Sequence, residues 1–210
     1  MLIKGIAVSG FGEDAADEEN IRNTQGEYII PGSSLKGVLR NRITYIARKL
    51  KGKFLLDNIF GSVGKGKDKG NCGHIIVKDT VVGNKENNEN VPLQHRIHVD
   101  KFTGGVMTGG LFSEKNIVGD LKLEIMVSEN PYTDEAAGLL LLALRDLSAG
   151  LFNIGSGYNI GKGYIDVETI KIIKGVKEAV IRIHENQIDD PSGMIPSVLA
   201  ALSNATRKEK

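Results

Sequence analysis

The chain has 210 residues, of which 40% are hydrophobic and 25% are charged, a composition typical of a soluble globular protein with one packed core. The net charge is only +1, which excludes a uniformly basic surface, so any attraction for a nucleic acid must come from a local cluster of cations. The single cysteine, Cys72, excludes an internal disulfide, and the longest apolar run, 139–144, is too short to span a bilayer. We therefore expect a cytoplasmic protein with no membrane partner.

The N-terminal part of the chain is expected to form a strand, an acidic loop and a long helix. Residues 2–8 are apolar enough for a strand, and five acids then follow with no cation before Arg22. The sequence Pro31-Gly32-Ser33-Ser34 is a turn that carries a helix-start signal. Apolar residues then recur at spacings of three or four, which predicts a helix whose buried stripe consists of Leu35, Leu39, Ile43, Ile46 and Leu50.

The rest of the chain is expected to add strands and further helices around an insertion. Hydrophobic patterning predicts strands at 74–82, 121–127, 164–173 and 179–183. It predicts helices at 133–148 and, within a short apolar patch, at 195–202. Residues 83–118 are expected to be an insertion between core strands, irregular up to about Asn116. The order strand, helix, strand, strand, helix, strand predicts an α+β fold with a ferredoxin-like (RRM-like) βαββαβ core, in a single domain over 1–210.

The first predicted helix carries the strongest local charge in the sequence. From Lys36 to Lys53 there are seven cations and no acid, namely Lys36, Arg40, Arg42, Arg48, Lys49, Lys51 and Lys53. A solvated basic face would have the same pattern. However, the free amides of a helix start, the hydroxyls of Ser33 and Ser34, and the amine of Lys36 together favour a phosphate-binding site.

Two glycine clusters resemble nucleotide-binding motifs, but each lacks a feature that its motif requires. Residues 61–67 resemble the first part of a P-loop, but Asp68 stands where Ser or Thr is needed. The cluster 155–161 is one residue too long for a dinucleotide-binding turn. Instead, the loop 155–163 would let its backbone approach a polynucleotide closely, and Tyr158 would stack on a base. A tight turn that closes the last strand is the alternative.

Candidate catalytic groups are few. His95 and His98 lie close together, but the sequence nearby has no further residues to complete a zinc site. His98 is a candidate general base, and the alternative is a histidine at a strand edge or on the surface. Asp17, in the acidic stretch, would hold a divalent metal that stabilises a phosphate during attack by the neighbouring 2′-hydroxyl. A solvated acidic loop is the alternative for Asp17.

The run Ile30-Pro31-Gly32-Ser33-Ser34-Leu35-Lys36-Gly37, followed by Arg40, resembles the signature of the CRISPR-associated RAMP superfamily. More narrowly, it resembles the guide-binding backbone subunits of type III effector complexes, the Csm and Cmr groups. The stretches 99–105 and 109–112 and the glycine loop 155–163 also agree, so the resemblance extends from about residue 5 to about residue 170.

This resemblance implies an RRM-like core whose copies stack along a guide RNA beside other CRISPR effector subunits. It implies that Lys36 and Arg40 contact guide phosphates, and that an aspartate cuts the paired target RNA with Mg or Mn. Asp17 precedes Arg22 by five residues and Gly26 follows, which makes Asp17 the matching position and Asp14 the fallback. The residues expected to contact RNA are Ser33, Ser34, Lys36, Arg40, Arg42, Lys101, Gly155, Gly157, Tyr158, Gly161 and Lys162.

Three alternatives stay open at this point. The first is a scaffold with the same RNA contacts and no catalysis. The second is a metal-independent, guide-processing endonuclease of the same superfamily, with His98 as general base. The third is an unrelated ferredoxin-like interaction protein.

Overall fold

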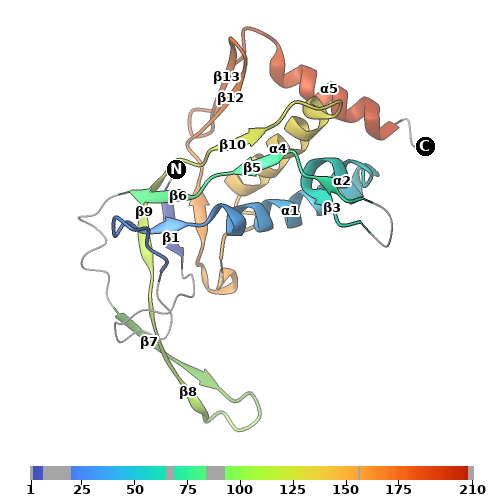
Figure 1. The fold of residues 1–210 in the computed structure, drawn as a ribbon. Coiled ribbons are helices and arrows are strands. Elements are labelled where there is room, and N and C mark those ends of the chain that lie inside the picture. Colours follow the sequence, from blue (N-terminus) through green and yellow to red (C-terminus); the bar gives the residue numbers. More distant parts are fainter. Residues whose placement is uncertain (1, 7–19, 65–68, 84–92, 156, 208–210) are drawn as a thin grey trace. The chain divides into compact units, whose positions relative to one another are not determined.

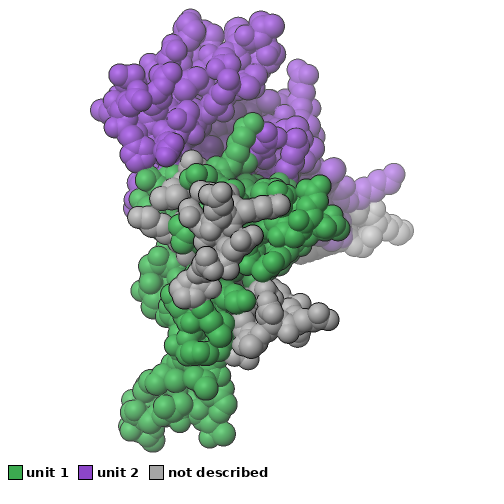
Figure 2. Space-filling model, turned by 90° about the vertical axis from the view of Figure 1, so that its left-hand side faces the viewer, with its two compact units in different colours: residues 1–31, 79–122, 153–166 green, residues 32–78, 123–152, 167–210 purple. Residues whose placement is uncertain are grey.

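The computed structural model describes residues 2–6 as backbone and residues 20–64, 69–83, 93–155 and 157–207 in full (Figure 1). The chain forms two compact units, each assembled from separate segments (Figure 2). Unit 1 comprises residues 1–31, 79–122 and 153–166, and unit 2 comprises residues 32–78, 123–152 and 167–210. Both units combine short antiparallel strands or hairpins with helical segments, which confirms the α+β class. The expectation of a single domain stays a prediction.

Unit 1 contains a five-stranded sheet with the order β11-β1-β9-β6-β2. Its strands are β1 (Leu2–Ile6), β2 (Ile29–Ile30), β6 (Thr80–Gly83), β9 (Ile117–Leu121) and β11 (Tyr164–Asp166). Buried and exposed residues alternate along β9, as expected for a sheet with one covered face. Every described neighbour pair in this sheet is antiparallel. A ferredoxin-like core, which is built from split βαβ units, is not established by this pairing and stays a prediction.

The insertion between β6 and β9 contains a long hairpin, so the prediction of an irregular segment up to Asn116 was wrong. Its strands are β7 (Leu93–Val99) and β8 (Val106–Lys115), paired antiparallel. Asp100 fixes the turn, because its Oδ1 accepts hydrogen bonds from the backbone amides of Phe102 and Thr103, both at 2.8 Å. Most side chains on both faces are exposed, so the hairpin lacks the apolar alternation that marks a half-buried strand.

The described residues of unit 2 form four helices. They are α1 (Gly32–Lys49), α2 (Leu55–Phe60), α4 (Thr133–Ser148) and α5 (Met194–Arg207). The predicted stripe of α1 is buried as far as Ile46, whereas Leu50 lies beyond the helix and is 37% exposed. The prediction for α4 is confirmed at both ends, α5 extends beyond the predicted patch, and α2 was not predicted. The core of the unit gathers residues of α1, α2 and α4 around Ile43 and Leu139, both fully buried.

The strands of unit 2 form three small antiparallel sheets. In the first, β5 (Ile75–Val77) pairs with β10 (Ile125–Val127). In the second, β3 (Gly61–Ser62) pairs with β4 (Asn71–Cys72). In the third, β13 (Lys177–Arg182) lies between β12 (Thr169–Lys174) and β14 (Gln187–Asp189) and pairs with both. Three predicted strands, 74–82, 121–127 and 164–173, are each divided between two sheets. The chain leaves one unit for the other after residues 78, 122 and 166. The hydrophobic residues continue across these three positions, so the hydrophobic pattern of the sequence did not show that each predicted strand is interrupted.

Candidate nucleic-acid interface

The first turn of α1 is fixed tightly within unit 2. A Cβ at Gly32 would collide with the carbonyl oxygen of Val77, so only glycine fits at the start of the helix. Leu35 is 1% exposed. The Lys36 Nζ donates a hydrogen bond to the carbonyl oxygen of Ile75 at 2.8 Å. The motif around Pro31 therefore holds the beginning of the helix against β5.

The opposite face of α1 is open and polar. The exposed residues there include Ser33, Ser34, Gly37, Arg40, Asn41 and Arg48, and Tyr45, one turn beyond Asn41, is exposed as well. The helix contains no acidic residue. The first amides of an α-helix have no acceptor within the helix, and its N-terminus carries a partial positive charge. Hydroxyls, amides and guanidinium groups on one face can all donate hydrogen bonds to phosphate oxygens.

The cations predicted to contact RNA have different surroundings. Arg42 is half-buried, and its Nη2 pairs with the Oδ2 of Asp146 at 2.7 Å. Asp146 is 2% exposed, and Arg145 holds its other oxygen, also at 2.7 Å. Arg42 thus ties α1 to α4 by a charge-assisted hydrogen bond. Arg40 is exposed, with its Cζ 5.6 Å from the centroid of the Phe60 ring, which leaves its guanidinium available to a ligand.

The glycine loop before β11 closes as a tight turn. Gly157, Gly161 and Gly163 all have positive φ, of 76°, 82° and 67°, and a short 3-10 helix spans Tyr158–Ile160. A Cβ at Gly163 would collide with the carbonyl oxygen of Ile154. The turn presents Tyr158, whose 66% exposure leaves the ring free to stack on a base. The loop is therefore both a strand-closing turn and a platform for one aromatic ring.

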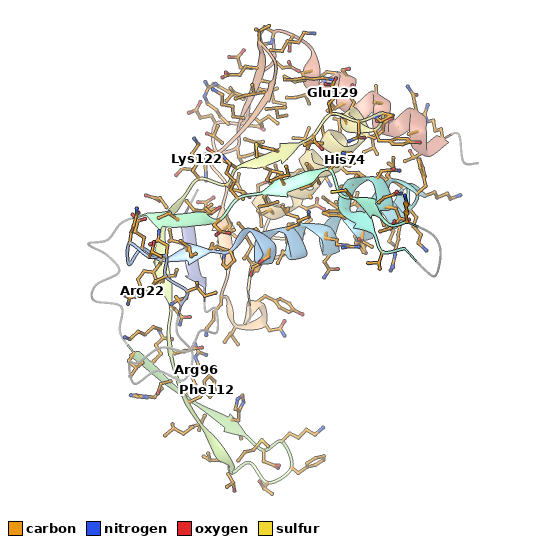
Figure 3. All side chains as sticks on the ribbon, viewed as in Figure 1. Arg22, His74, Arg96, Phe112, Lys122 and Glu129 are labelled. Carbon is orange, nitrogen blue, oxygen red and sulfur yellow. The ribbon has the colours of Figure 1, made fainter. Side chains whose placement is uncertain are left out.

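Lys162 of this loop is buried in an ion-pair cluster that sequence reasoning did not anticipate. Its Nζ pairs with Glu114 of β8, and Glu114 also pairs with Arg96 of β7, which Figure 3 labels on the hairpin. Glu114 is 2% exposed and Lys162 is 7% exposed. Burial alone would raise the pKa of Glu114, but the hydrogen bond and charge of Lys162, with the charge of Arg96, outweigh it and lower the pKa. The structure thus gives the Lys162 amine a partner inside unit 1.

The β7–β8 hairpin exposes large apolar side chains around its turn. Phe102 is 86% exposed, and the Nζ of Lys101 lies 4.8 Å from the centroid of its ring. Farther along, the ring of His98 stacks on that of Phe112, with centroids 4.7 Å apart and an angle of 22° between the planes. The turn signal from Asp100 to Gly105, which begins with an aspartate and ends with two glycines, could have revealed this hairpin.

The residues that would carry catalysis are only partly described. Asp17 and Asp14 lie outside the described residues. Within the described residues, no three His, Cys, Asp or Glu side chains gather as a metal site. His95 shares a 2.9 Å hydrogen bond with the Ser113 hydroxyl. His98 has its ring against Phe112.

Comparison with known proteins assigns the family. None of the helices in the described part of the chain has the length and apolar character that a membrane crossing requires. A search of curated proteins finds no match. The family model of the RAMP superfamily matches residues 9–166, which include α1, the hairpin and the glycine loop. The chain therefore belongs to the RAMP superfamily, whose members are CRISPR-associated and generally bind RNA.

Proposed function

We propose that this protein is the guide-RNA-binding backbone subunit of a type III CRISPR effector complex. The observation that carries the proposal is the open face of α1. Hydroxyls, an amide and the guanidinium of Arg40 gather there in the N-terminal half of a helix that contains no acid and is fixed to β5. Such a face suits a chain of phosphates, because every polar group on it can act as a donor.

The proposed contacts are to the RNA backbone and carry little sequence preference. Arg40, Ser33 and Ser34 contact phosphate oxygens, and base pairing between guide and target supplies the specificity. Lys36 and Arg42 contribute mainly through their positions within unit 2, because each already has a protein partner. This division differs from the simple reading in which all cations of the helix contact the guide.

Exposed rings supply a second type of contact in this proposal. Phe102 with Lys101 on the hairpin, and Tyr158 on the glycine loop, are exposed aromatic groups within unit 1. A ring of this kind stacks on any base, which suits a protein that binds guides of varied sequence. Copies of the chain along one guide would each bring the same rings.

Cleavage of the paired target RNA at Asp17 is part of the proposal and rests on the sequence alone. A divalent ion, Mg or Mn, would supply charge stabilisation at the phosphate under attack. The test is the reconstituted complex with guide-complementary RNA, with wild type compared with Asp17→Asn. Regularly spaced products that vanish in the variant, with guide binding intact, support a nuclease subunit. Equal products from both place the chemistry at Asp14 or in another subunit, and no products from either indicate a scaffold.

RNA binding itself is tested by charge reversal on α1. Arg40→Glu removes one phosphate contact and adds repulsion, so we expect the affinity for guide RNA to fall at least about tenfold. The slope of log affinity against log salt should also decrease by about one. Lys177→Glu, an exposed cation of β13 in the same unit, is the matched control. Equal effects of the two variants, or an affinity that does not respond to salt, would favour an unrelated interaction protein.

A further inference from the structure

Gly37 lies in the interior of α1, where glycine is an unfavourable residue. It is the sixth residue of a helix that spans Gly32–Lys49. Glycine weakens a helix interior relative to alanine, because its backbone loses more conformational freedom on folding. A glycine at this position therefore needs a reason other than the helix itself.

Packing against the part of the chain that the structure describes does not supply that reason. A Cβ built at Gly37 has no described atom within 4 Å, apart from its chain neighbours and the nearby helix backbone. The backbone of Gly37 does not have a positive φ, so its conformation is open to any residue. Gly32 and Gly138 are different, because a Cβ at Gly32 meets Val77 and one at Gly138 meets the carbonyl oxygen of Val198 at 2.9 Å.

The surroundings of Gly37 are the polar groups of the open face. On a helix surface, residues three and four positions away are the nearest neighbours. For Gly37 these are Ser33, Ser34, Arg40 and Asn41, which are all exposed. The centre of the face thus has no side chain, while hydrogen-bond donors stand on either side of it along the helix.

We propose that Gly37 is the point where the phosphodiester backbone of single-stranded RNA comes closest to α1. The inference rests on the proposed function and deepens it, since it names the place of contact. A methyl group at residue 37 projects about 1.5 Å, one C–C bond, from the helix backbone. Such a displacement lengthens the hydrogen bonds from Ser33, Ser34 and Arg40 beyond their useful range of about 3.2 Å.

The test separates stability from binding in the full-length chain. Gly37→Ala should raise the melting temperature by roughly 2–4 °C, because alanine favours the helix. It should also weaken binding of an end-labelled single-stranded RNA of mixed sequence roughly tenfold, as expected when one or two charged hydrogen bonds are lost. Gly37→Gln should weaken binding further. Asn204→Ala, an exposed position on α5, is the matched control, since it gains helix propensity and should leave the affinity unchanged.

The outcomes distinguish this inference from the proposed function. If Gly37→Ala raises the melting temperature and leaves RNA affinity at the wild-type value while Arg40→Glu weakens it, the close contact is refuted and RNA binding by α1 stands. If the wild-type chain itself shows no salt-dependent RNA binding, the proposed function fails first. Weaker binding by Gly37→Ala than by Asn204→Ala, at equal or higher stability, supports the contact.

Discussion

The buried pair of Lys162 and Glu114 allows a quantitative test of how the glycine loop is held. The perturbation is Lys162→Met, which keeps the apolar stem and removes the charge. Glu114 is 2% exposed, so the variant leaves a carboxylate away from water with Arg96 and the side chain of Asn116 as its remaining partners. Breaking a buried ion pair costs about 3–5 kcal/mol, and the remaining arginine places the expected loss near the lower end, at about 3 kcal/mol.

The assay is urea unfolding followed by circular dichroism, with the double variant Glu114→Gln/Lys162→Met as the internal reference. Replacing both partners removes the uncompensated charge, so we expect the double variant to recover most of the lost stability. On this reasoning Lys162 supports RNA binding by holding the loop rather than by contacting a phosphate. RNA affinity should therefore fall in Lys162→Met and recover in the double variant. A single variant that unfolds at the wild-type urea concentration, or a double variant that is stable but still binds RNA weakly, would refute this reasoning.

Three further predictions concern acid stability, the hairpin ring and the histidine alternative. The pKa of Glu114 lies below its ordinary value of 4.5. The stability that its charge supplies is therefore present above pH 4.5 and is lost as the pH falls through the lowered pKa. Urea midpoints measured across an acid series should show this loss in wild type and not in Glu114→Gln. Phe102→Ala should weaken guide-RNA binding by about 1–3 kcal/mol in titrations, with little change in melting temperature, since the ring is 86% exposed; an unchanged affinity would remove the ring from the interface. His98→Ala should leave RNA cleavage intact, whereas cleavage that persists in a chelator and disappears in this variant would favour the guide-processing alternative.

Helices α1 and α4 of unit 2 were the most predictable part of the fold, whereas α2 was not predicted. In α1, apolar residues at spacings of three and four were enough to predict both the helix and its buried side. The motif at Pro31 likewise indicated where the helix begins. These features are local, so a short window of sequence contains the information needed to recognise them.

The strands were less predictable because their limits depend on distant partners. The run 121–127 reads as one strand, but Leu121 pairs in the sheet of unit 1 and Ile125 pairs with β5 in unit 2. The hairpin β7–β8 has few buried side chains and therefore gave no periodic signal. A local window shows neither the break within 121–127 nor the extent of the hairpin strands, although the turn signal from Asp100 to Gly105 marks where the hairpin reverses.

The cations of the candidate interface were predictable from the sequence, but the protein partners of those cations were not. The sequence places cations on α1, but it does not show that Asp146, more than one hundred residues away, pairs with Arg42. In the same way, Glu114 takes the amine of Lys162 from a distant strand. Which cations remain available to a ligand is decided by long-range pairing, and only the three-dimensional structure reveals it.

The most direct test of guide binding by α1 is ultraviolet cross-linking of guide RNA in the reconstituted complex, with the modified peptides identified by mass spectrometry. The account predicts cross-links in the peptide that contains residues 33–41, and weaker recovery of that peptide in Arg40→Glu. Cross-links confined to the sheet of β12, β13 and β14, with none on α1, would contradict it.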